Sequence, residues 1–106
     1  MKNLNLNYEG FEEYLVERKD RSMTNLRFEK EPGVMYVFRF ENNYGASIIK
    51  LFGSYGYEEN LWELAVIQFD EDNEYDITYD TPITKDVEGR LTDEDVRNLL
   101  ARIKEL

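Results

Sequence analysis

Two apolar runs, joined by a short connection rich in tyrosine and glycine, constrain this sequence most. They are residues 45–52, GASIIKLF, and residues 61–69, LWELAVIQF. Both runs are apolar at nearly every position, which is the pattern of a central strand covered on both faces. We therefore expect residues 43–69 to form the middle of a sheet, with the rest of the chain forming its cover and its edges.

The segment before this pair has the alternation of a strand. Residues 23–31 place Leu26 and Phe28 on one side and polar residues on the other, as in a half-buried edge strand. Pro32 and Gly33 suit the two central positions of a type II turn, because proline presets φ and glycine accepts a positive φ. The sequence thus predicts an edge strand followed by a tight turn.

Further strands are expected on both sides of the apolar pair. Residues 34–41 should return antiparallel to the edge strand, and residues 75–80 alternate between apolar and polar side chains as a last edge strand does. Residues 80–91 form a polar connector that three apolar side chains, Ile83, Val87 and Leu91, pin to the body. The pattern predicts a meander of about five antiparallel strands.

Two segments have apolar residues at helical spacing. Residues 9–20 predict a short N-terminal helix with Phe11, Tyr14, Leu15 and Arg18 at i, i+3, i+4 and i+7. Thr92 and Asp95 form a capping box before a second apolar stripe, made of Val96, Leu99, Leu100, Ile103 and Leu106. The predicted fold is α+β: one domain over residues 1–106, with an N-terminal and a C-terminal helix packed on the meander.

The composition excludes several kinds of site. The 106 residues include no cysteine and no histidine. A disulfide framework, a thiolate nucleophile and a Ser-His or Cys-His arrangement are therefore excluded, and the commonest metal ligand is missing. No apolar run is long enough for a signal peptide or a membrane span. We expect a soluble protein of the bacterial cytoplasm that needs no membrane, metal or cofactor.

The negative charge is concentrated in one part of the chain. The net charge is −10, and residues 58–95 alone hold 14 acidic and 2 basic side chains, a net charge of −12. Such a field repels nucleic acid phosphates, so direct binding of DNA or RNA is not expected. Three interpretations remain open for the acidic block: a surface that favours solubility, a docking face for a basic protein, and a DNA mimic whose carboxylates imitate phosphates.

A calcium site in the acidic segment 70–74, DEDNE, does not fit the spacing of an EF-hand. Its sixth position is Tyr75, where a glycine is required, and its twelfth is Thr81, where a glutamate is required. The segment is expected to be the solvated tip of a hairpin.

Glu63 is the one acidic residue inside an apolar run. Burial there would raise its pKa, and paired carboxylates can perform the acid–base chemistry of a small hydrolase. The alternative is structural, with Glu63 paired across the sheet with Lys50 or Arg39. We favour the structural interpretation, because a domain of this size encloses little of a cleft.

The connection between the apolar runs, GSYGYEEN, is the candidate binding loop. Its tyrosines are expected to be accessible, and tyrosine is enriched at protein interfaces. The alternative is that the tyrosines fold back over the sheet edge. The predicted partner-binding residues are those of this loop and of the acidic hairpin: Tyr55, Tyr57, Glu58, Glu59, Asp70, Glu71, Asp72 and Glu74.

Residues 40–106 contain a series of short motifs: NYGASIIK, SYG, LWELAVI, YDTPIT, DVEGRLT and the closing DVRNLLARIKEL. In these motifs the chain resembles a group of small, uncharacterised bacteriophage and prophage proteins. The resemblance implies a phage setting, and small acidic phage proteins often bind a host protein, but it transfers no functional residue.

The sequence therefore predicts a non-enzymatic protein that binds a protein partner. One alternative is a DNA mimic that inhibits a host nuclease, of the anti-CRISPR or anti-restriction type, or a transcription factor. In that case the partner is a basic nucleic-acid-binding protein. The other alternative is a structural role. The chain is expected to be a monomer, or a weak homodimer formed through an open sheet edge.

Overall fold

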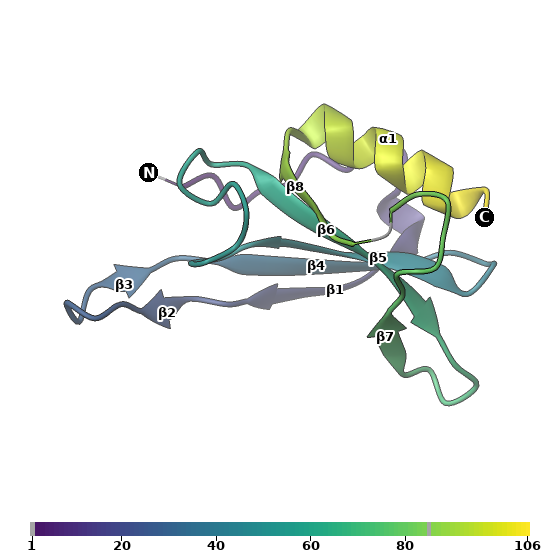
Figure 1. The fold of residues 1–106 in the computed structure, drawn as a ribbon, viewed down its shortest axis with the longest axis horizontal. Coiled ribbons are helices and arrows are strands. Elements are labelled where there is room, and N and C mark those ends of the chain that lie inside the picture. The colour runs from purple at the N-terminus through teal and green to yellow at the C-terminus, as the bar shows by residue number, and fades with distance from the viewer. Residues whose placement is uncertain (1, 85) are drawn as a thin grey trace.

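The computed structural model describes residues 2–84 and 86–106. Within these residues, six antiparallel strands form one curved sheet with a helix on one face (Figure 1). Strands β4 (Val34–Arg39), β5 (Tyr44–Lys50) and β6 (Trp62–Phe69) form its centre, β1 (Leu15–Asp20) is one edge, and β7 (Tyr75–Ile77) and β8 (Glu88–Leu91) both pair with β6. The predicted central pair is thus confirmed, with one more strand than the expected meander of about five.

The C-terminal helix α1 (Asp93–Lys104) forms as its sequence predicts. The Thr92 hydroxyl accepts a hydrogen bond from the Asp95 backbone N–H at 3.1 Å, and the Asp95 carboxylate accepts one from the Thr92 N–H at 3.0 Å. This capping box satisfies two backbone donors that the first turn leaves free. The stripe of Val96, Leu100 and Ile103 is fully buried against the sheet.

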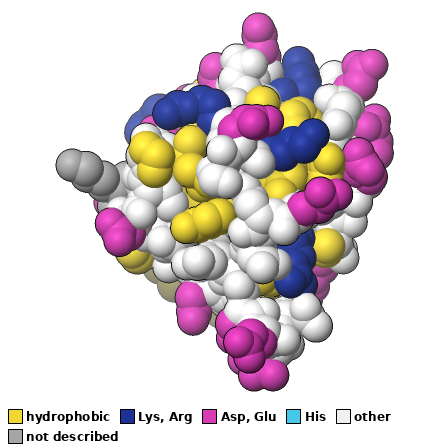
Figure 2. All heavy atoms as spheres, turned by 90° about the vertical axis from the view of Figure 1, so that its right-hand side faces the viewer, with side chains coloured by type: hydrophobic (Ala, Val, Ile, Leu, Met, Phe, Trp, Pro, Cys, Tyr) yellow, Lys and Arg dark blue, Asp and Glu magenta, His cyan; other side chains and the backbone are white. Residues whose placement is uncertain are grey.

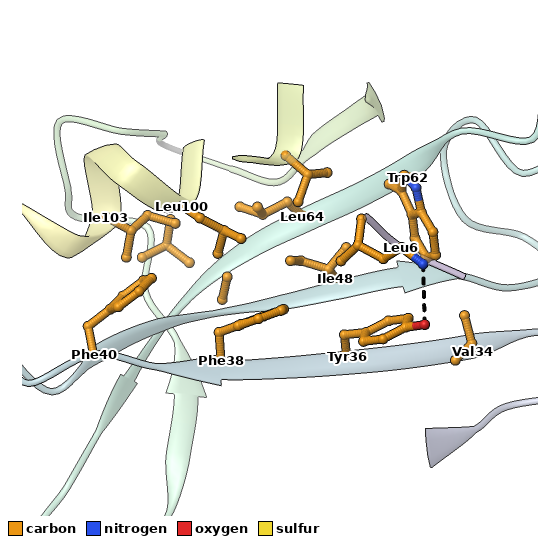
Figure 3. Close-up of a cluster of buried hydrophobic side chains, with 13 residues drawn as sticks. Leu6, Val34, Tyr36, Phe38, Phe40, Ile48, Trp62, Leu64, Leu100 and Ile103 are labelled. Carbon is orange, nitrogen blue, oxygen red and sulfur yellow. Dashed lines mark hydrogen bonds between the residues drawn. The ribbon is translucent and has the colours of Figure 1, made fainter. Parts of the chain in front are cut away.

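The core lies between this helix and the helix-facing side of β4, β5 and β6 (Figure 3). A strap formed by residues 2–8 crosses the same side and buries Leu6. The Tyr36 hydroxyl holds this strap in place, accepting a hydrogen bond from the Leu6 N–H at 3.3 Å and donating one to the Leu4 carbonyl at 2.9 Å. Residues 2–8 are therefore part of the layer that covers the core.

The predicted N-terminal helix is wrong. Residues 12–14 form only a 3-10 turn, η1 (Glu12–Tyr14), and β1 begins at the next residue. The apolar spacing was interpreted correctly in one respect, because Phe11 and Tyr14 both pack on Phe40, with ring centroids 6.3 Å and 4.9 Å away. A turn followed by a strand brings these two side chains to the core just as a helix would. The strand also satisfies its backbone hydrogen-bonding groups by pairing with β4.

The predicted edge strand over residues 23–31 is wrong too. These residues form a second, two-stranded sheet, β2 (Met23–Thr24) with β3 (Lys30–Glu31), that extends the β1–β4 hairpin beyond the main sheet (Figure 1). We call residues 21–33 the arm. The turn lies at its tip, not at Pro32-Gly33. Gly33 instead continues the ladder, since its carbonyl accepts the Arg21 N–H at 2.9 Å.

The connector over residues 80–91 contains a strand that its sequence did not predict. β8 pairs with the first half of β6, with Trp62 opposite Leu91, while β7 pairs with the second half. Ile83 and Leu91 pack against the core, as expected of residues that pin this segment, whereas Val87 is half-buried and is not part of that cluster. In residues 2–84 and 86–106, no helix has the length and apolar character needed to cross a membrane.

Candidate interaction surfaces

The tyrosine-rich loop is mostly a folded part of the domain. Tyr57 is only 2% exposed, and its hydroxyl donates a 2.6 Å hydrogen bond to the Pro32 carbonyl at the base of the arm. Burial raises the pKa of this phenol, with Glu31 and Glu58 adding to the effect. The expectation that Tyr57 is accessible to a partner is therefore wrong, because its ring fills the space between the loop and the arm.

Tyr55 is the accessible tyrosine of the loop, with 59% of its surface exposed. Its backbone N–H donates to the Glu63 carboxylate at 2.8 Å, so Glu63 fixes the loop. The predicted pairing of Glu63 with Lys50 or Arg39 is wrong. Lys50 lies on the opposite face of the sheet, and Arg39 bonds to two asparagines.

Two acidic residues of the loop, Glu58 and Glu59, are exposed as expected. Glu59 accepts a 3.4 Å contact from the Arg90 guanidinium, and both side chains are at least half exposed. A salt bridge in that setting contributes little to stability. These carboxylates remain accessible to a partner.

The acidic segment forms the hairpin between β6 and β7, as predicted. The Asp70 carboxylate accepts the backbone N–H groups of Asp72 and Glu74, at 2.8 Å and 3.0 Å, and so shapes the turn itself. All residues from Asp70 to Ile77 are exposed. In the described part of the chain, no carboxylate of residues 70–76 forms a salt bridge. The hairpin thus presents a local excess of negative charge.

The loop and the acidic hairpin do not come together. One precedes β6 and the other follows it, so the full length of that extended strand separates them (Figure 1). Figure 2 looks onto the end of the molecule that carries the hairpin, where acidic side chains lie around the outline with basic and apolar side chains between them. The predicted partner-binding residues therefore form two separate surfaces.

The β6–β7 hairpin curls back beneath the face of the sheet that α1 does not cover. The Arg39 guanidinium reaches it from β4, donating to the amide oxygens of Asn73 at 2.7 Å and Asn43 at 3.0 Å. The same guanidinium lies 4.6 Å from the centroid of the Phe69 ring. Gly45 makes room for that ring, because an added Cβ there would lie 3.1 Å from it.

This curl encloses a shallow hollow of about 490 Å³ between β1, β4 and the hairpin. It is lined by Val16, Glu17, Val37, Arg39, Phe69, Asn73 and Tyr75. Val37, Ile67 and Phe69 form a small second core beneath it. The hollow is therefore a concave region of mixed polar and apolar character on the face that no helix covers.

The tip of the arm is a surface that sequence reasoning missed. Leu26 is 100% exposed and Phe28 is 91% exposed, although both were expected on the buried side of a strand. Asn25 organises the tip: its side-chain oxygen accepts the N–H groups of Arg27 at 2.8 Å and Glu29 at 3.0 Å. Its backbone N–H also donates to the Glu29 carbonyl at 2.9 Å. The loop is therefore closed by its own hydrogen bonds and not by its apolar side chains.

Phe28 also has an unusual backbone. Its φ is +61°, in the left-handed region, where asparagine and glycine are favoured and a large aromatic residue is rare. Four other described non-glycine residues have a positive φ; three are asparagines, Asn43, Asn60 and Asn73, and the fourth is Arg90. Asn25 was a sequence signal for the turn at the arm tip, because asparagine is a residue that often begins turns. The alternation of apolar and polar residues around it, however, has the same pattern as a strand.

One buried cation lies on the helix-facing side of the sheet. Lys50 is 2% exposed; its ammonium donates to the Asn3 carbonyl at 2.7 Å and the Asn60 side chain at 3.0 Å, and lies 4.1 Å from the Trp62 ring centroid. Burial lowers the pKa of Lys50, partly offset by Asp93. With so little access to solvent, this lysine ties the strap to β5 and is not a site for a substrate.

Within the described residues, no group of three or more acidic side chains is arranged to hold a metal ion. No family model, curated protein or solved structure matches the chain.

Proposed function

We propose that this protein acts without catalysis, by binding a protein partner in a phage or prophage setting, and that the arm tip is its anchor. The observation that supports this most is the exposure of Leu26 and Phe28, at 100% and 91%, on a loop that its own hydrogen bonds hold in place. The phage setting rests on the resemblance of residues 40–106.

Two unfavourable features meet at this tip. Fully burying a leucine or phenylalanine side chain stabilises a fold by about 1.5–3 kcal/mol. Leu26 and Phe28 both lack this stabilisation, because both are exposed. Phe28 also bears the left-handed strain of about 1–2 kcal/mol. Strain of this kind persists where it serves recognition, and the ordered loop lowers the entropy that a partner must overcome. Phenylalanine is one of the residue types enriched in the buried core of protein interfaces.

The acidic hairpin supports a second contact, with a basic partner. Its five carboxylates at residues 70–76 have no salt bridge within the described residues, and they lie far from the arm. A charged surface of this kind raises the rate of association and makes binding sensitive to salt. The DNA-mimic interpretation belongs to this surface.

Affinity capture from a bacterial host lysate tests the proposal. The baits are the wild-type chain, a Leu26→Asn/Phe28→Asn variant, and a Tyr55→Asn variant as the matched control, since Tyr55 is an exposed aromatic on a different surface. We expect a partner that the wild type and Tyr55→Asn retain at about 0.5 M salt, where charge contacts are screened, and that the arm variant loses.

Two results would overturn the anchor. The first is a partner lost with Tyr55→Asn and kept by the arm variant, which would assign binding to the loop. The second is a partner kept by both variants but released by salt and by Glu71→Gln/Asp72→Asn, which would assign binding to the acidic hairpin. Turnover of a substrate by the pure protein would overturn the non-catalytic assignment.

A further inference from the structure

We infer that the chain also associates with itself, the arm tip of one copy docking into the hollow beneath the β6–β7 hairpin of another. This inference rests on the arm tip being an anchor, as proposed above. It assigns one occupant to the hollow, the arm tip of a second copy of the chain. Three features carry it: the shapes of the two surfaces, their charges, and their positions on the molecule.

The shapes are complementary in kind. The arm offers two projecting apolar side chains, and the hollow offers apolar walls made by Val16 and Tyr75 over a buried floor of Val37 and Phe69. The rest of its lining is polar: Glu17, Arg39 and Asn73. Its volume is about 490 Å³, and it is open to solvent, so a projecting side chain of another molecule can enter it. Val16 and Tyr75 are partly exposed, at 56% and 36%, so the hollow also has apolar surface left to bury.

The charges are opposite. The arm, residues 21–33, holds three basic and two acidic side chains, a net charge of +1. Residues 70–76, beside the hollow, hold five acidic side chains and no basic one, a net charge of −5. Arg27 stands between Leu26 and Phe28 in the sequence, so docking would bring its guanidinium close to the hairpin carboxylates. Opposite charges favour this approach over contact between two arms or two hairpins.

The positions require a second molecule. The arm and the hairpin lie at opposite ends of the long axis, which measures 43 Å (Figure 1). An arm therefore cannot reach the hollow of its own chain. Because the contact joins two different surfaces, each copy has one arm to give and one hollow to offer, and a copy that lacks either surface can still use the other.

Complementary variants test the contact. Phe28→Asn removes the projecting aromatic ring of the arm tip and leaves the hollow unchanged. Val16→Arg places a positive charge at the rim of the hollow and leaves the arm unchanged. Both sites are exposed, and asparagine suits the backbone of position 28, so both variants should fold. Sedimentation velocity over a range of protein concentrations gives the size of each species.

We expect the wild type to self-associate, and its dissociation constant to rise about tenfold between about 0.05 M and 0.5 M salt. Each variant alone should sediment as a monomer, and an equal mixture of the two should form a dimer, because it restores one arm and one hollow. A wild type that stays monomeric up to about 1 mM would overturn the inference. A mixture that stays monomeric, or a Phe28→Asn variant that associates like the wild type, would also overturn it.

The capture experiment separates this inference from the proposed function. Val16→Arg keeps the arm, so it should still capture a host partner while losing self-association. If the wild type self-associates but captures no partner through the arm, the proposed function fails and the inference stands. If the arm captures a partner but the wild type is monomeric, the inference fails and the proposed function stands.

Discussion

At the scale of single residues, Phe28 has a backbone conformation that its side chain disfavours and a ring that touches little of its own molecule. Replacing it with asparagine removes the left-handed strain and keeps the turn, so we expect Phe28→Asn to raise the free energy of unfolding by about 1 kcal/mol. Leu26→Asn is the control. It is equally exposed but not strained, so its effect should stay within about 0.5 kcal/mol. Urea denaturation measures both; a destabilised Phe28→Asn would mean that the ring has a structural contact.

Two buried titratable side chains predict how stability depends on alkaline pH. Lys50 loses its proton at a lower pH in the folded chain than its ordinary 10.5, so the free energy of unfolding should rise with pH from that lowered pKa up to 10.5. Tyr57 ionises above its ordinary 10.0 in the folded chain, so its contribution should be lost as pH rises above 10.0.

Urea denaturation between about pH 7 and pH 11 checks these two slopes, which have opposite signs. The rise should be absent in Lys50→Met, and the fall should be absent in Tyr57→Phe. If each variant kept the slope of the wild type, the titrating groups would lie elsewhere. In the wild type, the plot of the free energy of unfolding against pH should therefore change slope near pH 10, and this change reports on Lys50 and Tyr57 together.

At the scale of elements, the curl of the sheet depends on β5 having no side chain at Gly45. An added Cβ would lie 1.8 Å from the Phe38 carbonyl oxygen and 3.1 Å from the Phe69 ring. We expect Gly45→Ala to lower the free energy of unfolding by about 3 kcal/mol, because β4, β5 and the ring must all shift. Gly10→Ala is the control: its Cβ would meet nothing within 4 Å, and only the left-handed φ of +94° would cost about 1–2 kcal/mol. Thermal denaturation measures both variants. If Gly45→Ala and Gly10→Ala destabilised the fold equally, the neighbours of Gly45, Phe38 and Phe69, would be shown to move away from an added Cβ at little cost.

Elements could be predicted where the signal was local. The central strands and α1 follow from apolar runs and from a capping box whose two members lie three residues apart. The arm could not be predicted, because alternation in residues 23–31 fits a strand and a hairpin equally well. The buried position of Tyr57 could not be predicted either, since its partner is a carbonyl 25 residues away in the sequence.

At the scale of the whole molecule, the uneven charge has a spatial counterpart that the sequence order only partly revealed. The count along the chain located the acidic block, but the sheet divides that block between the loop at one end of β6 and the hairpin at the other. The arm, whose sequence holds Arg21, Arg27 and Lys30, lies at the end of the molecule opposite that hairpin (Figure 1). The molecule therefore carries a charge difference along its 43 Å axis, which is the arrangement that the inferred contact between two copies would use.

The layer over the core also has a consequence for how fast the chain folds. Arg97 on α1 donates to the carbonyl of Asn7 in the strap at 3.0 Å, across 90 residues of sequence, and Asn42 donates to carbonyls of the helix end 61 to 64 residues away. The hairpins of the sheet join neighbouring segments and can form within microseconds, whereas closing longer loops costs about 0.6 kcal/mol more entropy for each doubling of loop length. We therefore expect the sheet to form first with its core face exposed to solvent, and the rate of folding to be set by the arrival of the two chain ends.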